Sequence, residues 1–239
     1  MALEGKRILV TRPAELAGGL AARIREAGGE PVLYPAIEIR EPADPAAARA
    51  LLARAGEFEL AVFVSPSAVR MAFALHAGPW PRRVAAVGEG TRRALEERGF
   101  DGVIAPAGRA DSEALLALPE MARWQSVLLV RGTGGRELIG ETLAARGAKV
   151  EIAECYRRVR PVAPPPAGRL DAICANSGEA LENLAALLGT ERLKQAVVFV
   201  PHPRVAARAA ALGLPPSVLA GPGDAEMLAQ LVAYFGGAK

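Results

Sequence analysis

The chain has 239 residues, of which 51% are hydrophobic and 23% are charged, and its formal net charge at pH 7 is +3. No apolar stretch approaches the roughly 18 residues of a membrane helix, and the first residues lack the apolar core of a signal peptide. The two cysteines form no Cys-x-x-Cys pair, which argues against a disulfide framework and a structural zinc site. We therefore expect a cytoplasmic globular protein of one or two domains, with free buried thiols at Cys155 and Cys174 and no membrane partner.

Short apolar runs alternate along the chain with stretches rich in Ala, Leu, Arg and Glu at helical spacing, a pattern typical of α/β proteins with parallel sheets. The runs predict strands at 7–11, 31–34, 60–64, 84–87, 102–105, 126–130, 149–152, 171–175, 196–200 and 217–220. The stretches between them predict helices at 14–27, 45–55, 66–76, 90–98, 111–118, 134–145, 178–188, 203–211 and 224–235. Helix caps are predicted at Ser65, Asp111, Ser177 and Asp224, and glycines that end helices at 28, 99, 147 and 213.

Two segments of the chain each resemble a later segment. Segment A, residues 7–34, aligns without a gap on segment A′, residues 127–152, so that arginines and glycines coincide. Segment B, residues 61–99, likewise resembles segment B′, residues 172–213. The order A, B, A′, B′ indicates a duplicated unit and two similar lobes. The alternative is chance resemblance between generic strand–helix units.

Two extended segments that run into proline, 36–42 and 155–161, interrupt this alternation. The first is acidic and the second carries three arginines, so an antiparallel pair of the two would be charge-complementary. Such a pair predicts a two-stranded connector, with A and B′ in one lobe and B and A′ in the other. A plain tandem with its boundary near 119–123 is the alternative.

Small, hydroxylic or arginine side chains follow six of the predicted strands. Ligands of open parallel sheets bind beyond the carboxyl ends of the strands, near helix N-termini. An edge with N–H, hydroxyl and guanidinium donors suits a ligand with several carboxylates or phosphates. The alternative is that the hydroxyl and amide groups only cap helices. The strand ends are Thr-Arg-Pro at 11–13, Ser-Pro-Ser at 65–67, Gly-Glu-Gly-Thr at 88–91, Arg-Gly-Thr-Gly-Gly-Arg at 131–136, Asn-Ser-Gly at 176–178 and His-Pro-Arg at 202–204.

Other site types find less support. The 25 arginines against 4 lysines reflect either coding bias or arginines that converge on an anion. Nucleic acid is not expected as a partner, because the chain has 11 aromatic residues and no compact basic run. The loop at 132–135 does not fit Gly-x-Gly-x-x-Gly, since the sixth position is Glu137, so a nucleotide cofactor is weakly supported. His76 and His202 lack partners at catalytic or metal-binding spacing, and no metal is expected.

Tyr156 lies on the second extended segment, where it would face a cleft between the lobes. A phenol keeps its proton at neutral pH and can donate that proton or a hydrogen bond. The alternative is that Tyr156 is an aromatic that packs between the lobes.

Six motifs, in this order, resemble those of the uroporphyrinogen-III synthase family, and the similarity covers nearly the whole chain. They are ILVTRP at 8–13, FVSPSAV at 63–69, VGEGT at 87–91, SEAL at 112–115, LVRGTGGR at 129–136 and CYRR at 155–158. HPR at 202–204 resembles a variant of a loop that reads Gly-x-Thr in other members, which leaves the role of this loop open.

The resemblance implies an α/β fold of two flavodoxin-like lobes with parallel sheets, joined by a two-stranded β-ladder, so that the chain crosses twice between the lobes. The bounds would be 1–35 with 162–239 for lobe 1, 42–153 for lobe 2, and 36–41 and 154–161 for the connector strands. It also implies a cofactor-free cyclising lyase of haem biosynthesis, and we expect a monomer. The substrate would be hydroxymethylbilane, a linear tetrapyrrole with eight carboxylates, and the product uroporphyrinogen III.

In this chemistry the hydroxyl of ring A departs as water, and the reactive azafulvene that remains closes without help to the uninverted isomer. The enzyme would hold the chain so that ring D attacks through its substituted carbon, giving a spiro intermediate that fragments and recloses with ring D inverted. Tyr156 matches the cleft tyrosine of the family, and we expect it to assist departure of the hydroxyl by proton donation. Substrate-binding roles are predicted for Arg12, Ser65, Ser67, Gly88, Thr91, Arg131, Gly132, Arg136, Asn176, Ser177 and Arg204.

Two competing hypotheses come from other functional classes. One is a non-catalytic two-lobed hinge protein that binds an anionic small molecule. The other is a nucleotide-dependent enzyme that uses the loop at 132–135.

Overall fold

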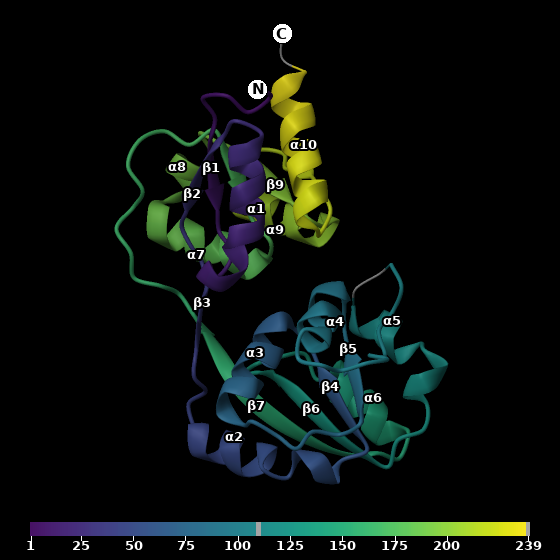
Figure 1. The fold of residues 1–239 in the computed structure, drawn as a ribbon. Helices are drawn as coiled ribbons and strands as arrows, with labels where there is room; N and C mark the ends of the chain where they lie inside the picture. The colour runs from purple at the N-terminus through teal and green to yellow at the C-terminus, as the bar shows by residue number, and fades with distance from the viewer. Residues whose placement is uncertain (109–110, 238–239) are drawn as a thin grey trace. The chain divides into compact units, whose positions relative to one another are not determined.

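The computed structural model describes residues 1–108 and 111–237 and shows an α/β protein with two five-stranded sheets (Figure 1). The chain divides into two compact units, one formed by Met1–Glu38 with Val159–Lys239 and the other by Ile39–Arg158. The predicted α/β class with mainly parallel sheets is confirmed, since the pairs β1–β2, β1–β8, β8–β9, β9–β10, β4–β5, β4–β6 and β6–β7 are all parallel.

The first sheet has the order β10-β9-β8-β1-β2. Its strands are β1 (Arg7–Val10), β2 (Glu30–Leu33), β8 (Ala172–Cys174), β9 (Val197–Val200) and β10 (Val218–Leu219). The central strands are short continuous apolar runs, as expected for parallel strands that are covered on both faces. Because β1 pairs with both β2 and β8, segment A shares this sheet with segment B′.

Two long helices lie side by side on one face of the first sheet, α1 (Ala14–Glu26) and α10 (Asp224–Gly236) (Figure 1). The apolar stripe of α1 packs with Met227 and Leu231 of α10 over the buried strands. The other helices of this unit are α7 (Gly178–Leu188), α8 (Thr190–Leu193) and α9 (Pro203–Ala211), and α7 contacts both α8 and α9.

The second sheet has the order β3-β7-β6-β4-β5. Its strands are β3 (Glu38–Arg40), β4 (Leu60–Phe63), β5 (Arg83–Ala86), β6 (Ser126–Gly132) and β7 (Lys149–Val159). Strand β4 of segment B pairs with β6 of segment A′, so the sheets follow the exchanged arrangement rather than a plain tandem. Strand β3 lies at the edge beside β7, which is the longest strand of the two sheets.

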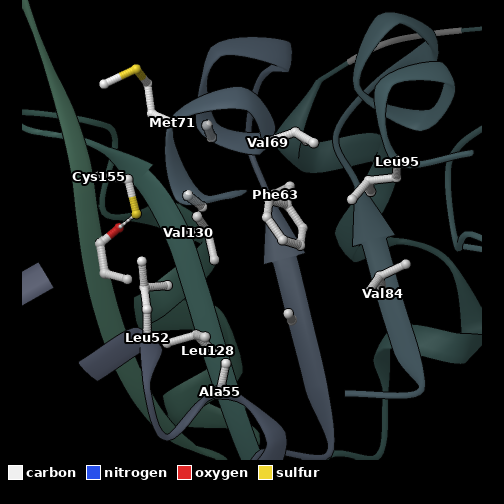
Figure 2. Close-up of a cluster of buried hydrophobic side chains, with 14 of the residues drawn as sticks. Leu52, Ala55, Phe63, Val69, Met71, Val84, Leu95, Leu128, Val130 and Cys155 are labelled. Atoms are coloured by element: carbon white, nitrogen blue, oxygen red, sulfur yellow. Dashed lines mark hydrogen bonds between the residues drawn. The ribbon is translucent and has the colours of Figure 1, made fainter. Parts of the chain in front are cut away.

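Helices cover both faces of the second sheet. One face is packed by α2 (Pro45–Leu52), the 3-10 turn η1 (Ala55–Glu57), α3 (Pro66–Leu75) and α4 (Glu89–Glu96). The other is packed by α5 (Ser112–Leu116), the 3-10 turn η2 (Pro119–Met121) and α6 (Leu138–Ala145). Figure 2 shows the first of these cores, in which Phe63 of β4, Val130 of β6 and Cys155 of β7 point toward the same helices.

Local signals in the sequence explain several element ends. Three of the four predicted caps are confirmed, because Ser65, Asp111 and Ser177 each accept a hydrogen bond from the amide three residues on. The fourth, Asp224, is wrong. Gly223 occupies the cap position of α10, and its amide donates a hydrogen bond to Glu226 Oε2 at 2.6 Å. The carboxylate of Asp224 instead pairs with Arg12.

Gly28 and Gly147, which coincide in segments A and A′, both follow a helix at positive φ, 91° and 94°. A side chain at such a position would strain the backbone, so the predicted helix-ending role is confirmed.

Two predicted elements are shorter than expected. The strand at 102–105 is reduced to a single bridge between Ala85 and Ile104. The helix expected from residue 134 begins only at Leu138, because residues 133–137 form a loop in which Gly134 has a φ of 73°. This loop shapes the carboxyl end of β6.

Candidate functional site

Tyr156 and Ser65 meet at the carboxyl edge of the second sheet. Tyr156 lies near the end of β7 and is only 4% exposed, with its ring in the core of this unit. Its hydroxyl is 3.0 Å from Ser65 Oγ, which caps α3 and accepts the amide of Ala68 at 3.0 Å. The phenol is thus enclosed by protein, where a hydrogen bond is stronger than in water.

Gly132 brings the backbone of β6 against the Tyr156 ring. A register shift after Arg131 sets Gly132 opposite Tyr156, and the next amide, Thr133 N–H, donates to the Tyr156 carbonyl at 2.8 Å. A Cβ added at Gly132 would lie 2.6 Å from two atoms of the ring, closer than carbon atoms can approach. Because the φ of Gly132 is not positive, glycine is required here by the close approach and not by backbone strain.

Three other predicted residues of this unit line the starts of α3 and α4. Ser67 is 6% exposed and Thr91 is 3% exposed, which is comparable with the 4% of Tyr156. Gly88 occupies the cap position of α4, with extended backbone. These residues therefore lie at the expected edge of the sheet, at or near the first turns of α3 and α4.

Arg131 is buried, and its two terminal nitrogens bond to its own surroundings. Its side chain donates to the carbonyls of Gly135 and Arg136 at 3.2 and 3.3 Å, and to Glu137 and Glu154 at 2.8 and 3.4 Å. Its Nε is buried without a hydrogen-bond partner. The hydrogen bond from Arg131 lowers the pKa of Glu137. This arginine thereby holds the 132–137 loop, and a ligand carboxylate must exchange with one of these acceptors to reach it.

Arg136 is exposed and pairs with an acid from the neighbouring helix. Its two terminal nitrogens contact Glu113 of α5 at 2.5 and 3.2 Å, a bidentate arrangement. The same hydrogen bonding lowers the pKa of Glu113 and raises the pKa of Arg136.

A cavity of about 490 Å³ lies beside α2 in this unit. Its apolar wall comes from α2 and Ile152, and its charged groups are Arg131, Asp44 and Glu154. Two carboxylates against one arginine that already binds Glu154 make this cavity a poor receptor for a polyanion.

In the other unit, Arg12 follows β1 and is tied to the start of α10. It forms an ion pair with Asp224 and donates to the carbonyl of Pro222 at 3.2 Å. Its Nε is also buried without a hydrogen-bond partner. Arg12 therefore fixes the loop before α10, and a ligand carboxylate would compete with Asp224 for it.

The remaining predicted residues follow β8 and β9. Asn176 has a buried Oδ1 without a hydrogen-bond partner, and Ser177 caps α7 by accepting the amide of Ala180 at 3.1 Å. His202 caps α9 by accepting the amide of Arg204 at 3.1 Å on Nδ1. The side chain of Arg204 is exposed, and no acidic partner is recorded for it among the described residues.

The structure brings Tyr156, Ser65 and Gly132 into contact, and it places Arg12 with Asn176 and Ser177 on neighbouring strand ends of the other unit. Sequence reasoning missed the acids that engage the predicted arginines, which are Glu113, Glu137, Glu154 and Asp224. Except for Glu137, which shares a loop with Arg131, these partners are distant along the chain and carry no local signal.

Other site types find no support in the described part of the chain. Residues 1–108 and 111–237 contain no group of three or more side chains that could hold a metal ion. No helix within those ranges has the length and apolarity to cross a bilayer. Both cysteines are free and buried, as predicted, and burial raises the pKa of each thiol to about 12. Thiols of this kind are not poised as nucleophiles.

Comparison with known proteins identifies the family. Residues 19–230 match the family described as uroporphyrinogen-III synthase HemD. The uroporphyrinogen-III synthase of Escherichia coli K12 is 39% identical over 158 residues, which cover 63% of this chain and 64% of that protein. The match thus spans less than two thirds of the E. coli protein. A putative uroporphyrinogen-III synthase of Methanothermobacter thermautotrophicus is 31% identical over 214 residues, 83% of each chain.

A solved structure agrees on the fold. The crystal structure of uroporphyrinogen-III synthetase from Helicobacter pylori superposes with a TM-score of 0.64 over 96% of this chain and 99% of that one, at 14% identity. At this identity the likeness establishes the fold alone. The family match over most of the sequence, together with the relative that covers 83% of both chains, shows that this chain belongs to the uroporphyrinogen-III synthase family.

Proposed function

We propose that this chain is a uroporphyrinogen-III synthase, a lyase that cyclises hydroxymethylbilane to uroporphyrinogen III with loss of water and inversion of ring D. The observation that carries the proposal is the enclosed phenol of Tyr156, set against the backbone of Gly132 and hydrogen-bonded to Ser65. A phenol that is held in place at the carboxyl edge of a parallel sheet can act as a general acid toward a substrate bound at that edge.

Tyr156 gives its proton to the hydroxyl of ring A, so that water departs and a reactive azafulvene remains. The rest of the task is geometric, because unassisted closure gives the uninverted isomer. The protein holds the chain so that the substituted carbon of ring D meets the ring A methylene, and surrounding residues exclude water from the cation. No cofactor takes part in this scheme.

Several donors grip the carboxylates of the substrate. The residues we propose for this role are Arg12, Ser65, Ser67, Gly88, Thr91, Arg131, Gly132, Arg136, Asn176, Ser177 and Arg204. Arg204 has an exposed guanidinium without an acidic partner among the described residues, whereas the other three arginines already bind acids. Binding to those three requires a substrate carboxylate to exchange with a protein carboxylate.

We also propose that each unit is a flavodoxin-like lobe. Numbered along the chain, the strands of the first sheet have the order 2-1-3-4-5, which is the flavodoxin-like order. In the second sheet the edge strand β3 is left out and the numbering starts at β6. The sequence β7, β6, β4, β5 and the bridge at Ile104 is then again the order 2-1-3-4-5. The β-ladder of this proposal is formed by the adjacent strands β3 and β7. Its lobes are 1–35 with 162–239 and 42–153, and its connector strands are 36–41 and 154–161.

One assay tests the proposed activity. Hydroxymethylbilane is supplied to the purified protein without added cofactor, and the uroporphyrinogen isomers are resolved by chromatography. Excess of type III over the protein-free control is expected. Type I alone, at the rate of that control, contradicts the proposal and favours a non-catalytic anion-binding protein. Elution as a monomer in size-exclusion chromatography is expected in the same preparation.

A further inference from the structure

We propose that Ser65 is a positioning residue for Tyr156, which orients the phenol so that its hydrogen points to the substrate. This inference deepens the proposed function and rests on it. It assigns Ser65 a role through Tyr156, in addition to any contact of Ser65 with the substrate.

The contacts define a directed chain of hydrogen bonds. The amide of Ala68, at the start of α3, donates to Ser65 Oγ at 3.0 Å, so this oxygen is an acceptor on one side. The Tyr156 hydroxyl lies 3.0 Å from the same oxygen. A serine hydroxyl has one hydrogen to donate. When Ser65 donates it to the Tyr156 oxygen, the phenol hydrogen is left for a third group.

Occupation of the site by substrate fixes this direction. The departing hydroxyl of the substrate is an acceptor, so Tyr156 donates to it and Ser65 donates to Tyr156. Every donor in the chain from Ala68 to the substrate is then used, and each bond polarises the next. The positive end of α3 lies at the head of the chain and favours negative charge that develops along it.

The proton-transfer step balances in this arrangement. The phenol O–H bond breaks as its proton joins the leaving hydroxyl, and the C–O bond breaks with its electron pair on oxygen. The products are water, a cationic azafulvene and the phenolate of Tyr156, which accepts the hydrogen bond from Ser65. The phenolate regains a proton when the last pyrrole ring loses its α-hydrogen after closure.

The duplicated unit shows what helix capping alone requires. Ser177, which caps the corresponding helix α7 in segment B′, accepts the amide of Ala180 at 3.1 Å. Among the described residues, this is the hydrogen bond recorded for the Ser177 hydroxyl, and no phenol shares it. A cap needs only an acceptor, which aspartate and asparagine also provide. The extra requirement at Ser65 is a hydroxyl hydrogen.

Three substitutions separate capping from donation to the phenol. Ser65→Thr keeps both functions and is expected to retain kcat within about 3-fold. Ser65→Ala loses both, and kcat is expected to fall about 10- to 100-fold, because a donor to a developing charge is removed. Ser65→Asp keeps the cap but can only accept, so it draws the phenol hydrogen toward itself. Its kcat is expected to be at or below that of Ser65→Ala, with a melting temperature near that of the parent protein.

A matched control separates these effects from loss of a cap. Asp44 caps α2 by accepting the amide of Ala47 at 2.9 Å and is not among the residues proposed for substrate. Asp44→Ala is expected to lower the melting temperature by about 2–4 °C, as Ser65→Ala does, while kcat stays at the parent value.

A double-mutant cycle with Tyr156→Phe tests whether Ser65 acts through the phenol. If it does, adding Ser65→Ala to Tyr156→Phe changes kcat by less than about 2-fold. Multiplicative effects of the two substitutions, or parental kcat in Ser65→Asp, overturn the Ser65 proposal while the parent protein still makes type III. A parent protein that makes only type I overturns the proposed function, and the Ser65 proposal falls with it.

Discussion

The two copies of the strand–helix–strand segment, β1–α1–β2 and β6–α6–β7, have an arginine–acid ion pair at the same place. An arginine lies at the end of the first strand of each copy, Arg12 two residues beyond β1 and Arg131 just before the last residue of β6. In both arginines Nε is buried without a hydrogen-bond partner. Each arginine pairs with an acid beside a helix start, Asp224 for Arg12 and Glu137 for Arg131. The shared arginine therefore anchors the carboxyl edge of each sheet.

The copies differ beyond that arginine. In segment A the helix begins at Ala14, whereas in segment A′ the loop 133–137 delays the helix to Leu138. Strand β2 ends at Leu33, but β7 continues to Val159 and carries Tyr156 on its extension. A scaffold that serves folding in both copies thus carries the proposed chemistry in only one, through a longer strand and a longer loop.

Tyr156 and Tyr34, one from each copy, give the strongest test of this contrast. Tyr156→Phe is expected to lower turnover about 100-fold or more, because the proton donor is removed while the ring remains. The hydroxyl of Tyr34, just after β2, donates to the Ala163 carbonyl at 3.2 Å, and Tyr34→Phe removes this hydroxyl. That variant is expected to lose about 1 kcal/mol of unfolding free energy and to keep its turnover. Steady-state kinetics and denaturant unfolding measure both, and equal turnover losses would abolish the contrast.

Gly132→Ala is expected to lower kcat about 10- to 100-fold. The new methyl would lie 2.6 Å from the Tyr156 ring, so the ring must shift away from Ser65. Gly140→Ala in α6 is the matched control, since its methyl would meet Leu129 at an ordinary 3.7 Å. The control should retain kcat and gain up to about 1 kcal/mol of stability. Parental kcat in Gly132→Ala would show that the position of the ring is not critical.

The same substitution at the two arginines should have different consequences. Arg131→Gln is expected to lower kcat about 10-fold and to cost about 2 kcal/mol of unfolding free energy, because the loop beside Tyr156 loses its anchor. Arg12→Gln should cost about 1–2 kcal/mol by releasing the loop before α10, and it should chiefly raise KM. Kinetics and chemical unfolding of both variants measure the difference. Equal changes in kcat, KM and unfolding free energy in the two variants would mean that the two arginines serve the same purpose.

The smallest effect is expected at the start of α4, where segments B and B′ differ in charge. Hydrogen bonds from Arg92 and Arg93 lower the pKa of Glu89 to about 2, whereas the corresponding turn of α9 carries Arg204. Because the folded pKa lies below the unfolded one, Glu89 contributes stability above about pH 4.5, which is lost as the pH falls toward 2. Melting temperatures of Glu89→Gln and the parent protein should therefore differ slightly at pH 6 and converge in acid. A difference independent of pH would exclude this pairing as its cause.

Local chemistry explains why much of the fold was predictable. Buried strands read as apolar runs, Ser65 and Ser177 announce helix starts, and Gly28 and Gly147 mark helix ends. The repeat and the two extended segments suggested the exchanged pairing of segments, but they left a plain tandem open as the alternative. Those signals act over a few residues, or over one repeat.

The partners of the arginines could not be predicted in this way. Asp224 is a residue type favoured at helix caps and is the first residue of α10, yet its carboxylate pairs with Arg12, which lies near the other end of the chain. The close approach of Gly132 to Tyr156 depends on a register shift between β6 and β7 that leaves no mark in the sequence. The family resemblance pointed to Tyr156, but the contact with Ser65 came from the structure.

The most direct test of the whole account is the isomer composition formed in a single turnover, with protein in excess over hydroxymethylbilane. The parent protein and Tyr34→Phe should give almost only type III, because catalysed closure outruns spontaneous closure. Tyr156→Phe should shift toward type I, since slower loss of water leaves time for the background reaction. Type I alone from the parent protein, or the same yield and rate of type III from Tyr156→Phe, would contradict the account.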